Sequence, residues 1–224
     1  MSAAARINAA GVGAWLLDVG AERFCLATQQ RLWSLAAPGS ALRAAPWFRE
    51  CVVGVNNLLL VFDALSADPA AARAQLLQCW QDSADQLQHQ AGATHDIAVD
   101  YDLSDSGDLA AIASRTGLSR PEVARLHSGA EYRVACVGSM PGFAYLVGLP
   151  EALATPRRAR PRAAMPRGGV IIGGAQAGIM PCSAPSGWHL LGSTEVNAFD
   201  PQRAVPCLFA PGDRVIFRAR EVTA

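Results

Sequence analysis

Arginine side chains gather in one glycine- and proline-rich stretch of this sequence, between residues 141 and 192. The stretch holds seven of the 14 prolines and nine of the 20 glycines, so its loops are expected to have fixed shapes. Its only acidic residue is Glu151, which stands against five arginines: Arg157, Arg158, Arg160, Arg162 and Arg167. Guanidinium groups bind carboxylates and phosphates through paired hydrogen bonds. The stretch therefore predicts an anion-binding surface, although a solvated arginine loop fits the charge pattern equally well.

The same stretch is poor in groups that could act as a catalytic base. It contains no Asp and no Lys, and its single histidine, His189, follows Trp188 in a strand-like segment, where a packed residue is the commoner case. Ser183 and Ser186 lack the Gly-x-Ser-x-Gly setting of a nucleophilic serine. The sequence identifies no catalytic residue, and it predicts that this chain supplies only part of an active site.

The overall composition excludes several classes of chemistry. All 19 basic residues are arginines, so the chain lacks the lysine that a Walker A loop or a Schiff-base enzyme needs. Nineteen acidic residues balance them, and a neutral chain is a poor ligand for nucleic acid or for an anionic membrane. The six cysteines form no Cys-x-x-Cys pair, so no metal site is expected. No apolar run reaches the roughly 18 residues of a membrane span, and the predicted location is the cytoplasm.

Strand and helix patterns alternate in the first hundred residues. They are a strand at 23–28, a helix at 30–37, a hairpin at 48–63, a helix from 68 towards 92 and a strand at 96–101. The hairpin turn falls on Asn56-Asn57, because asparagine tolerates positive φ, and Asp68 can cap the second helix with Pro69 at its first position. The resulting order is strand-helix-strand-strand-helix-strand. We therefore predict an N-terminal ferredoxin-like α/β sandwich domain over residues 1–103.

Residues 104–224 carry a different pattern, which begins with two short helices. The second helix opens with a capping box at Ser119 and Glu122. The helical pair resembles a helix-turn-helix, but three acidic and three basic residues balance between 105 and 129, so packing on a neighbouring domain is favoured over DNA binding. Short strand patterns broken by Gly and Pro follow, at 132–137, 170–173, 187–191 and 214–219. They predict a small β-barrel with a leading helical pair.

A series of short motifs runs through this second half of the chain. They are Pro-Gly-Phe at 141–143, Pro-Arg-Arg-Ala at 156–159, Pro-Arg at 161–162, Gln176, Gly-Ile at 178–179, Gly-Trp at 187–188 and Pro-Gly-Asp-Arg-Val at 211–215. In this order and spacing they resemble a bacterial family known as the 5-oxoprolinase B subunit, allophanate hydrolase subunit 1 or kinase A inhibitor.

The resemblance implies an α+β N-terminal domain followed by a cyclophilin-like β-barrel. It also implies a protein that works with a larger C subunit, similar to allophanate hydrolase subunit 2, in the ATP-dependent opening of 5-oxo-L-proline to L-glutamate. A third protein, the A subunit, would assist. ATP would bind the assembled complex at a site shared with the partner, and no covalent cofactor is implied. Two other activities stay open: inhibition of a sensor histidine kinase through the barrel surface, and carboxyl transfer related to allophanate or urea.

In the oxoprolinase interpretation Arg157 and Arg162 would bind an anionic group of the substrate. Gln176 and the backbone of Gly178 would orient the substrate, and Phe143 and Trp188 would form apolar walls. The alternative is that the two aromatic rings belong to the barrel core and the arginines brace loops.

The chain departs from the family pattern at several positions. Ala175, Ala177 and Met180 stand where the family commonly has Gly, Thr and Tyr, and Ser193 stands where Arg is common. Residues 102–104 read Asp-Leu-Ser instead of Gly-Gly-Glu. The lost hydroxyl and phenol would remove hydrogen-bonding groups from the ligand groove. This leaves open a different substrate or a weakened copy.

Overall fold

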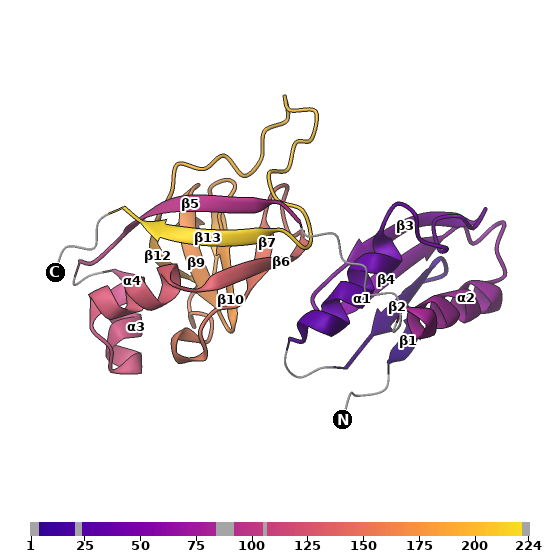
Figure 1. The fold of residues 1–224 in the computed structure, drawn as a ribbon, viewed down its shortest axis with the longest axis horizontal. Coiled ribbons are helices and arrows are strands. Elements are labelled where there is room, and N and C mark those ends of the chain that lie inside the picture. The colour runs from indigo at the N-terminus through magenta and orange to yellow at the C-terminus, as the bar shows by residue number, and fades with distance from the viewer. Residues whose placement is uncertain (1–4, 21–23, 84–91, 105–106, 221–224) are drawn as a thin grey trace. The chain divides into compact units, whose positions relative to one another are not determined.

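The computed structural model describes residues 5–20, 24–83, 92–104 and 107–220 (Figure 1). The chain divides into two compact units, Met1–Ala91 and Gly92–Ala224. Within the described ranges, none of the helices has the length and apolar character needed to cross a membrane.

The first unit is a four-stranded antiparallel sheet with two helices. The strands are β1 (Arg6–Ala9), β2 (Ala14–Asp18), β3 (Phe48–Val53) and β4 (Asn57–Phe62), and the helices are α1 (Leu26–Ala36) and α2 (Pro69–Asp82). The sheet order is β1-β2-β4-β3. Alternate residues of β4, Leu58 and Leu60, are fully buried against leucines of both helices, as expected for a sheet with one covered face.

Local signals in this unit are confirmed where they rest on specific turn and cap chemistry. Asn56 has a φ of 60°, and the hairpin pairs Val53 with Leu58. Asp68 accepts a hydrogen bond from the backbone N–H of Ala70 and so caps α2. The part of the second helix pattern that falls on residues 84–91 lies outside the described residues.

One predicted strand is wrong, and another forms as a strand but belongs to a different sheet. The segment 26–28, predicted as part of a strand, forms the first turn of α1, because Leu32, Trp33 and Leu35 bury a helical face. The strand predicted at 96–101 is β5 (Thr94–Tyr101), and it pairs with strands of the second unit instead of completing the first sheet. The edge strand of the first sheet next to β2 is instead β1, which precedes β2 in the sequence. The units therefore divide between residues 91 and 92, ahead of the predicted boundary at 103.

The second unit is a closed barrel of seven strands, and this confirms the predicted barrel. Its order is β10-β7-β6-β13-β5-β12-β9. The strands are β5, β6 (Glu131–Val137), β7 (Ala144–Val147), β9 (Gly169–Gly173), β10 (Gln176–Ile179), β12 (His189–Ser193) and β13 (Arg214–Ala219). A separate two-stranded sheet joins β8 (Arg162–Met165) to β11 (Ala184–Ser186), and a short 3-10 helix, η1, spans Glu151–Leu153. Figure 1 shows β5 and β13 running side by side across the barrel.

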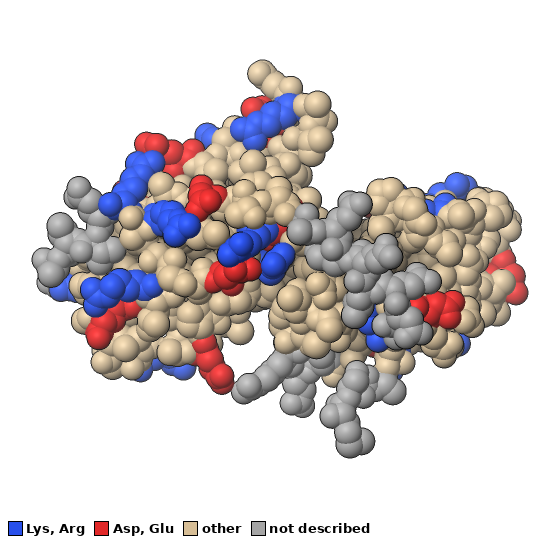
Figure 2. Space-filling model, in the orientation of Figure 1, with Lys and Arg blue, Asp and Glu red and all other residues tan. Residues whose placement is uncertain are grey.

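The two predicted helices, α3 (Asp108–Thr116) and α4 (Arg120–Ser128), pack on this barrel. Leu109, Ile112 and Val123 are fully buried in the barrel core cluster. Ser119 and Glu122 form the capping box that the sequence indicates. On the face drawn in Figure 2, acidic and basic side chains of this unit are interspersed, in contrast to the basic stripe of a nucleic-acid reader.

The side chain of His127, near the end of α4, is completely buried. The Tyr101 hydroxyl lies 2.7 Å from its Nδ1, and Tyr132 donates a hydrogen bond to its backbone carbonyl. Its ring centroid lies 4.7 Å from that of Phe217. Burial in this apolar surrounding lowers the pKa of His127 to about 3, because charging the ring there would remove an imidazolium from water.

We expect His127 to make the fold sensitive to mild acid. Below an unfolded pKa of about 6.5 the unfolded chain binds a proton that the folded chain does not, so the free energy of unfolding falls as the pH falls from there towards 3. Thermal melts should give a lower Tm at about pH 5 than at about pH 7. His127→Gln, which takes up no proton, should show a smaller difference. A variant with the full wild-type pH dependence would contradict this account.

Candidate functional site

A pocket of about 180 Å³ opens on the barrel unit beside the turn between β6 and β7. Its wall combines aromatic rings with methionine side chains and one arginine: Met140, Phe143, Tyr145, Arg157, Met180 and Trp188. Tyr145 comes from β7, Met180 follows β10, and Trp188 lies between β11 and β12. The rest of the lining is Ser139, Pro185, Ser186 and Gly187, so segments far apart in the sequence form one pocket with both polar and apolar surface.

The aromatic wall is a packed cluster of three rings. Phe143 stands edge-on to Tyr145 with ring centroids 4.9 Å apart, and to Trp188 at 5.8 Å. The Phe143 and Trp188 side chains are buried, so their positions are set by packing. Gly178 lies directly behind Phe143, and a Cβ at that position would come within 2.9 Å of the Phe143 ring. Glycine at 178 therefore lets the ring reach its place.

Arg157 supplies the positive charge at this pocket. Its guanidinium carbon lies 5.9 Å from the centroid of the Trp188 ring, within the range of a cation–π contact. The side chain is exposed, and no ion pair ties it to an acidic residue in the described part of the chain. Its hydrogen-bond donors are thus free to receive an anion.

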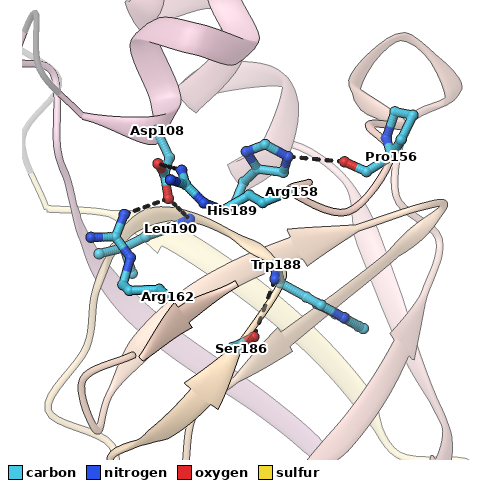
Figure 3. Close-up of polar contacts among 8 residues, drawn as sticks. All are labelled: Asp108, Pro156, Arg158, Arg162, Ser186, Trp188, His189 and Leu190. Carbon is cyan, nitrogen blue, oxygen red and sulfur yellow. Dashed lines mark hydrogen bonds and ion pairs between the residues drawn. The ribbon is translucent and has the colours of Figure 1, made fainter. Parts of the chain in front are cut away.

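Arg162 has a different environment, which centres on Asp108 at the start of α3 (Figure 3). The Asp108 side chain is only 7% exposed, and one carboxylate oxygen accepts from Arg162 Nη2 at 2.8 Å and from the Leu190 backbone N–H at 2.9 Å. The other oxygen accepts from Arg158. A buried carboxylate is stable only when its lone pairs are used in this way.

This cluster fixes the segment that carries Trp188. The Arg158 backbone N–H donates to the Gly187 carbonyl at 2.7 Å, and Leu190 is held by Asp108. His189 Nε2 lies 3.0 Å from the Pro156 carbonyl, to which it must donate, since a carbonyl only accepts (Figure 3). The histidine is therefore tied to the backbone, which suits the packed role expected from the sequence better than that of a base.

The structure brings together half of the six residues singled out from the sequence. Phe143, Arg157 and Trp188 line the pocket, and Gly178 supports it from behind. Arg162 is held by Asp108, in keeping with the loop-bracing alternative. Gln176 begins β10 and is absent from the described pocket lining.

Asp108 was missed by sequence reasoning, because nothing local marks it as the partner of arginines some 50 residues away. The available signal was indirect. Five arginines with a single acid among them need counter-charges from elsewhere in the chain.

The departures at 175, 177 and 180 fall in different places. Ala177 is fully buried in the barrel core, and Ala175 is exposed in the turn between β9 and β10. Met180 alone of the three lines the pocket, where its side chain is 2% exposed. The pocket wall therefore carries a thioether where the family pattern places a phenol, while the missing threonine hydroxyl has no bearing on it.

A small α+β unit followed by a closed seven-stranded barrel with an aromatic-lined pocket is the architecture that defines this class of protein. Residues 5–209 match the family described as the carboxyltransferase domain, subdomain C and D, and the chain belongs to this family.

Its relatives include the 5-oxoprolinase B subunit of Escherichia coli O157:H7, which is 40% identical over 195 residues, or 86% of each chain. The crystal structure of TTHA0988 superposes with a TM-score of 0.76 at 34% identity over 94% of this chain. That match takes up 40% of TTHA0988, so this chain spans less than half of its length. The Kluyveromyces lactis urea amidolyase shares the fold, with a TM-score of 0.76 at 20% identity over 97% of this chain and 15% of its own.

Asp108→Asn should destabilise the barrel unit, because it leaves Arg158 and Arg162 without their common counter-charge. We expect the free energy of unfolding to fall by about 2–4 kcal/mol, as measured by urea denaturation. The matched control is Asp96→Asn, which breaks an exposed pair with Arg218 and should change stability by about 1 kcal/mol or less. Equal effects from the two variants would show that the Asp108 cluster does not hold the loop.

Proposed function

We propose that this chain is the B subunit of an ATP-dependent 5-oxoprolinase, which opens the lactam of 5-oxo-L-proline to give L-glutamate. The observation that carries the proposal is the 40% identity to the 5-oxoprolinase B subunit of E. coli over 86% of both chains. An alignment of that length takes in residues of both units of the chain. The chemistry of the pocket supports the same conclusion.

The pocket suits a small ring that carries one carboxylate. A volume of about 180 Å³ is below the size typical of sites for drug-like ligands, and a five-membered lactam is correspondingly small. Phe143 and Trp188 offer apolar walls to the ring methylenes. Arg157, at the edge of the Trp188 ring, would bind the carboxylate through its guanidinium fork. Gly178 would shape the pocket wall. Gln176 and Arg162 would not touch the substrate but would help to hold the loops that form the pocket.

The pocket contains no group suited to activate water. Its described lining holds no carboxylate, imidazole or amine side chain, which are the usual general bases. Cleavage of the lactam C–N bond with addition of water therefore requires groups from another chain. We assign them to the larger C subunit, with ATP bound in the assembled complex at a site shared with that partner. The A subunit would assist as a third component.

TTHA0988 supports this arrangement. There the matched fold forms 40% of a longer polypeptide, so a protein of the same fold works as part of a larger whole. The complex would operate in the cytoplasm, where ATP is available and where the six cysteines, all unpaired here, would stay reduced.

Carboxyl transfer is the second candidate. It is favoured by the description of the family as a carboxyltransferase domain and by a fold shared with urea amidolyase. In that reaction a carboxyl group would pass to an amide such as urea, and Arg157 would face the carboxylate being transferred. The two candidates differ in substrate and products, so one assay separates them.

The assay uses this chain co-purified with the protein of the same genome that is similar to the remaining part of TTHA0988. We expect ATP-dependent release of glutamate from 5-oxoproline, with ADP formed in step, and none from either chain alone. Glutamate and ADP are measured by coupled enzymes. A stable complex that releases no glutamate would overturn the oxoprolinase proposal. Bicarbonate-dependent ADP formation with urea would favour carboxyl transfer, and inhibition of a histidine kinase's autophosphorylation would favour the regulatory role.

Arg157→Ala should weaken substrate binding without unfolding the chain. Loss of a charge-assisted pair is worth about 1.5–3 kcal/mol, so KM should rise roughly 10- to 100-fold while Tm stays near the wild-type value. Arg160→Ala provides the matched control, since Arg160 is exposed in the same loop and outside the pocket lining. If both variants kept the wild-type KM, the carboxylate would have to bind elsewhere.

A further inference from the structure

A long connection between β12 and β13 extends away from the barrel (Figure 1). Its outer part, residues 199–207, folds back on itself and is called the arm below. Phe199 bridges Cys207 at the base, and the Asp200 backbone N–H donates to the Pro206 carbonyl at 2.9 Å. Residues 201–206 between these contacts are all exposed. The arm is thus an ordered projection and not a slack loop.

Internal hydrogen bonds hold the tip of the arm in one shape. The Asp200 carboxylate accepts from the Gln202 backbone N–H at 3.0 Å and pairs with Arg203 at 3.4 Å. Arg203 also reaches the Asn197 carbonyl at 3.3 Å. Ordering six exposed residues costs conformational entropy, and a shape fixed in advance lowers the cost of binding a partner.

The arm carries an exposed apolar side chain. Val205 is 72% exposed and stands between Ala204 and Pro206, while the charges of Asp200 and Arg203 neutralise each other. An arm whose charges pair with each other has no net electrostatic attraction for an anionic membrane or a nucleic acid. Burial of the Val205 side chain against another protein would instead contribute favourably to affinity.

The base of the arm rests on the turn that lines the pocket. Gly142 of that turn has a φ of 80°, and a Cβ there would come within 2.6 Å of Phe199 Cβ and 2.8 Å of the Ala198 carbonyl. Met140 and Phe143, on either side in the same turn, both line the pocket. A polypeptide bound along the arm would therefore contact the segment that shapes the pocket wall, and it could bring in the reactive groups that the pocket lacks.

We propose that the arm, residues 199–207, is the docking element for the second polypeptide of the complex, and that docking places this polypeptide beside the pocket. The occupant is a chain of the kind that makes up the rest of TTHA0988, where the two parts are covalently joined. The inference rests on the proposed function for the existence of a partner, but it concerns where that partner binds.

The test is a binding measurement between this full-length chain and the protein of the same genome that is similar to the remaining part of TTHA0988. Val205→Asp places a charge at the exposed apolar position of the arm and should weaken the complex by about tenfold or more in isothermal titration calorimetry. Its Tm should match the wild type, because the side chain packs little within the chain. Leu65→Asp is the control: Leu65 is 99% exposed in the first unit, and its substitution should leave Kd unchanged.

Wild-type affinity in Val205→Asp, or no complex at all between the two wild-type proteins, would overturn the docking proposal. Failure of the enzymatic proposal has a different signature, since the complex would then form through the arm but release no glutamate. Equal weakening by Val205→Asp and Leu65→Asp would also count against the arm, because the effect would then follow from surface charge and not from the docking element.

Discussion

The pairing of β5 with β13 closes the barrel, and the positions of the pocket, the helical pair and the arm depend on that closure. β5 lies parallel to β13 over six residue pairs and antiparallel to β12, so it joins two strands that would otherwise be edges. A closed barrel satisfies the backbone hydrogen bonds of its strands and holds the connecting loops at fixed places around its ends. The pocket is built largely from such connections, with Tyr145 contributed by β7.

Two neighbouring arginines in one loop have different roles, one structural and one at the pocket. Arg158 forms an ion pair with the buried Asp108, while Arg157 lies at the pocket beside Trp188. The first contact anchors the loop to α3, and the second leaves a guanidinium available to a ligand. Since Asp108 also holds Leu190, one carboxylate positions both the loop with the arginines and the strand that follows Trp188. Arg157 is the charged residue of the described pocket lining, where Ser139, Tyr145 and Ser186 add hydroxyl groups to the aromatic and methionine side chains.

Local signals predicted the elements well where their chemistry is local. The Asn56 turn, the Asp68 cap and the Ser119–Glu122 capping box depend on residues within three positions of one another, and all three form as expected. The strand at 96–101 was also correct as a strand but was placed in the wrong sheet. Alternation of buried residues specifies which face of a strand is covered, and it carries no information about which strands flank it.

The sequence by itself determined the α+β class, the barrel, the family motifs and a basic segment poor in catalytic bases. Three of the residues that the family resemblance implies for the site, namely Phe143, Arg157 and Trp188, also line the pocket. Only the tertiary structure decided that Arg162 pairs with Asp108 while Arg157 lies beside Trp188 at the pocket, and that Ala177 faces the core while Met180 faces the pocket. These outcomes depend on contacts between residues far apart in the chain, whose energies are set by burial and geometry that arise only once the barrel has closed.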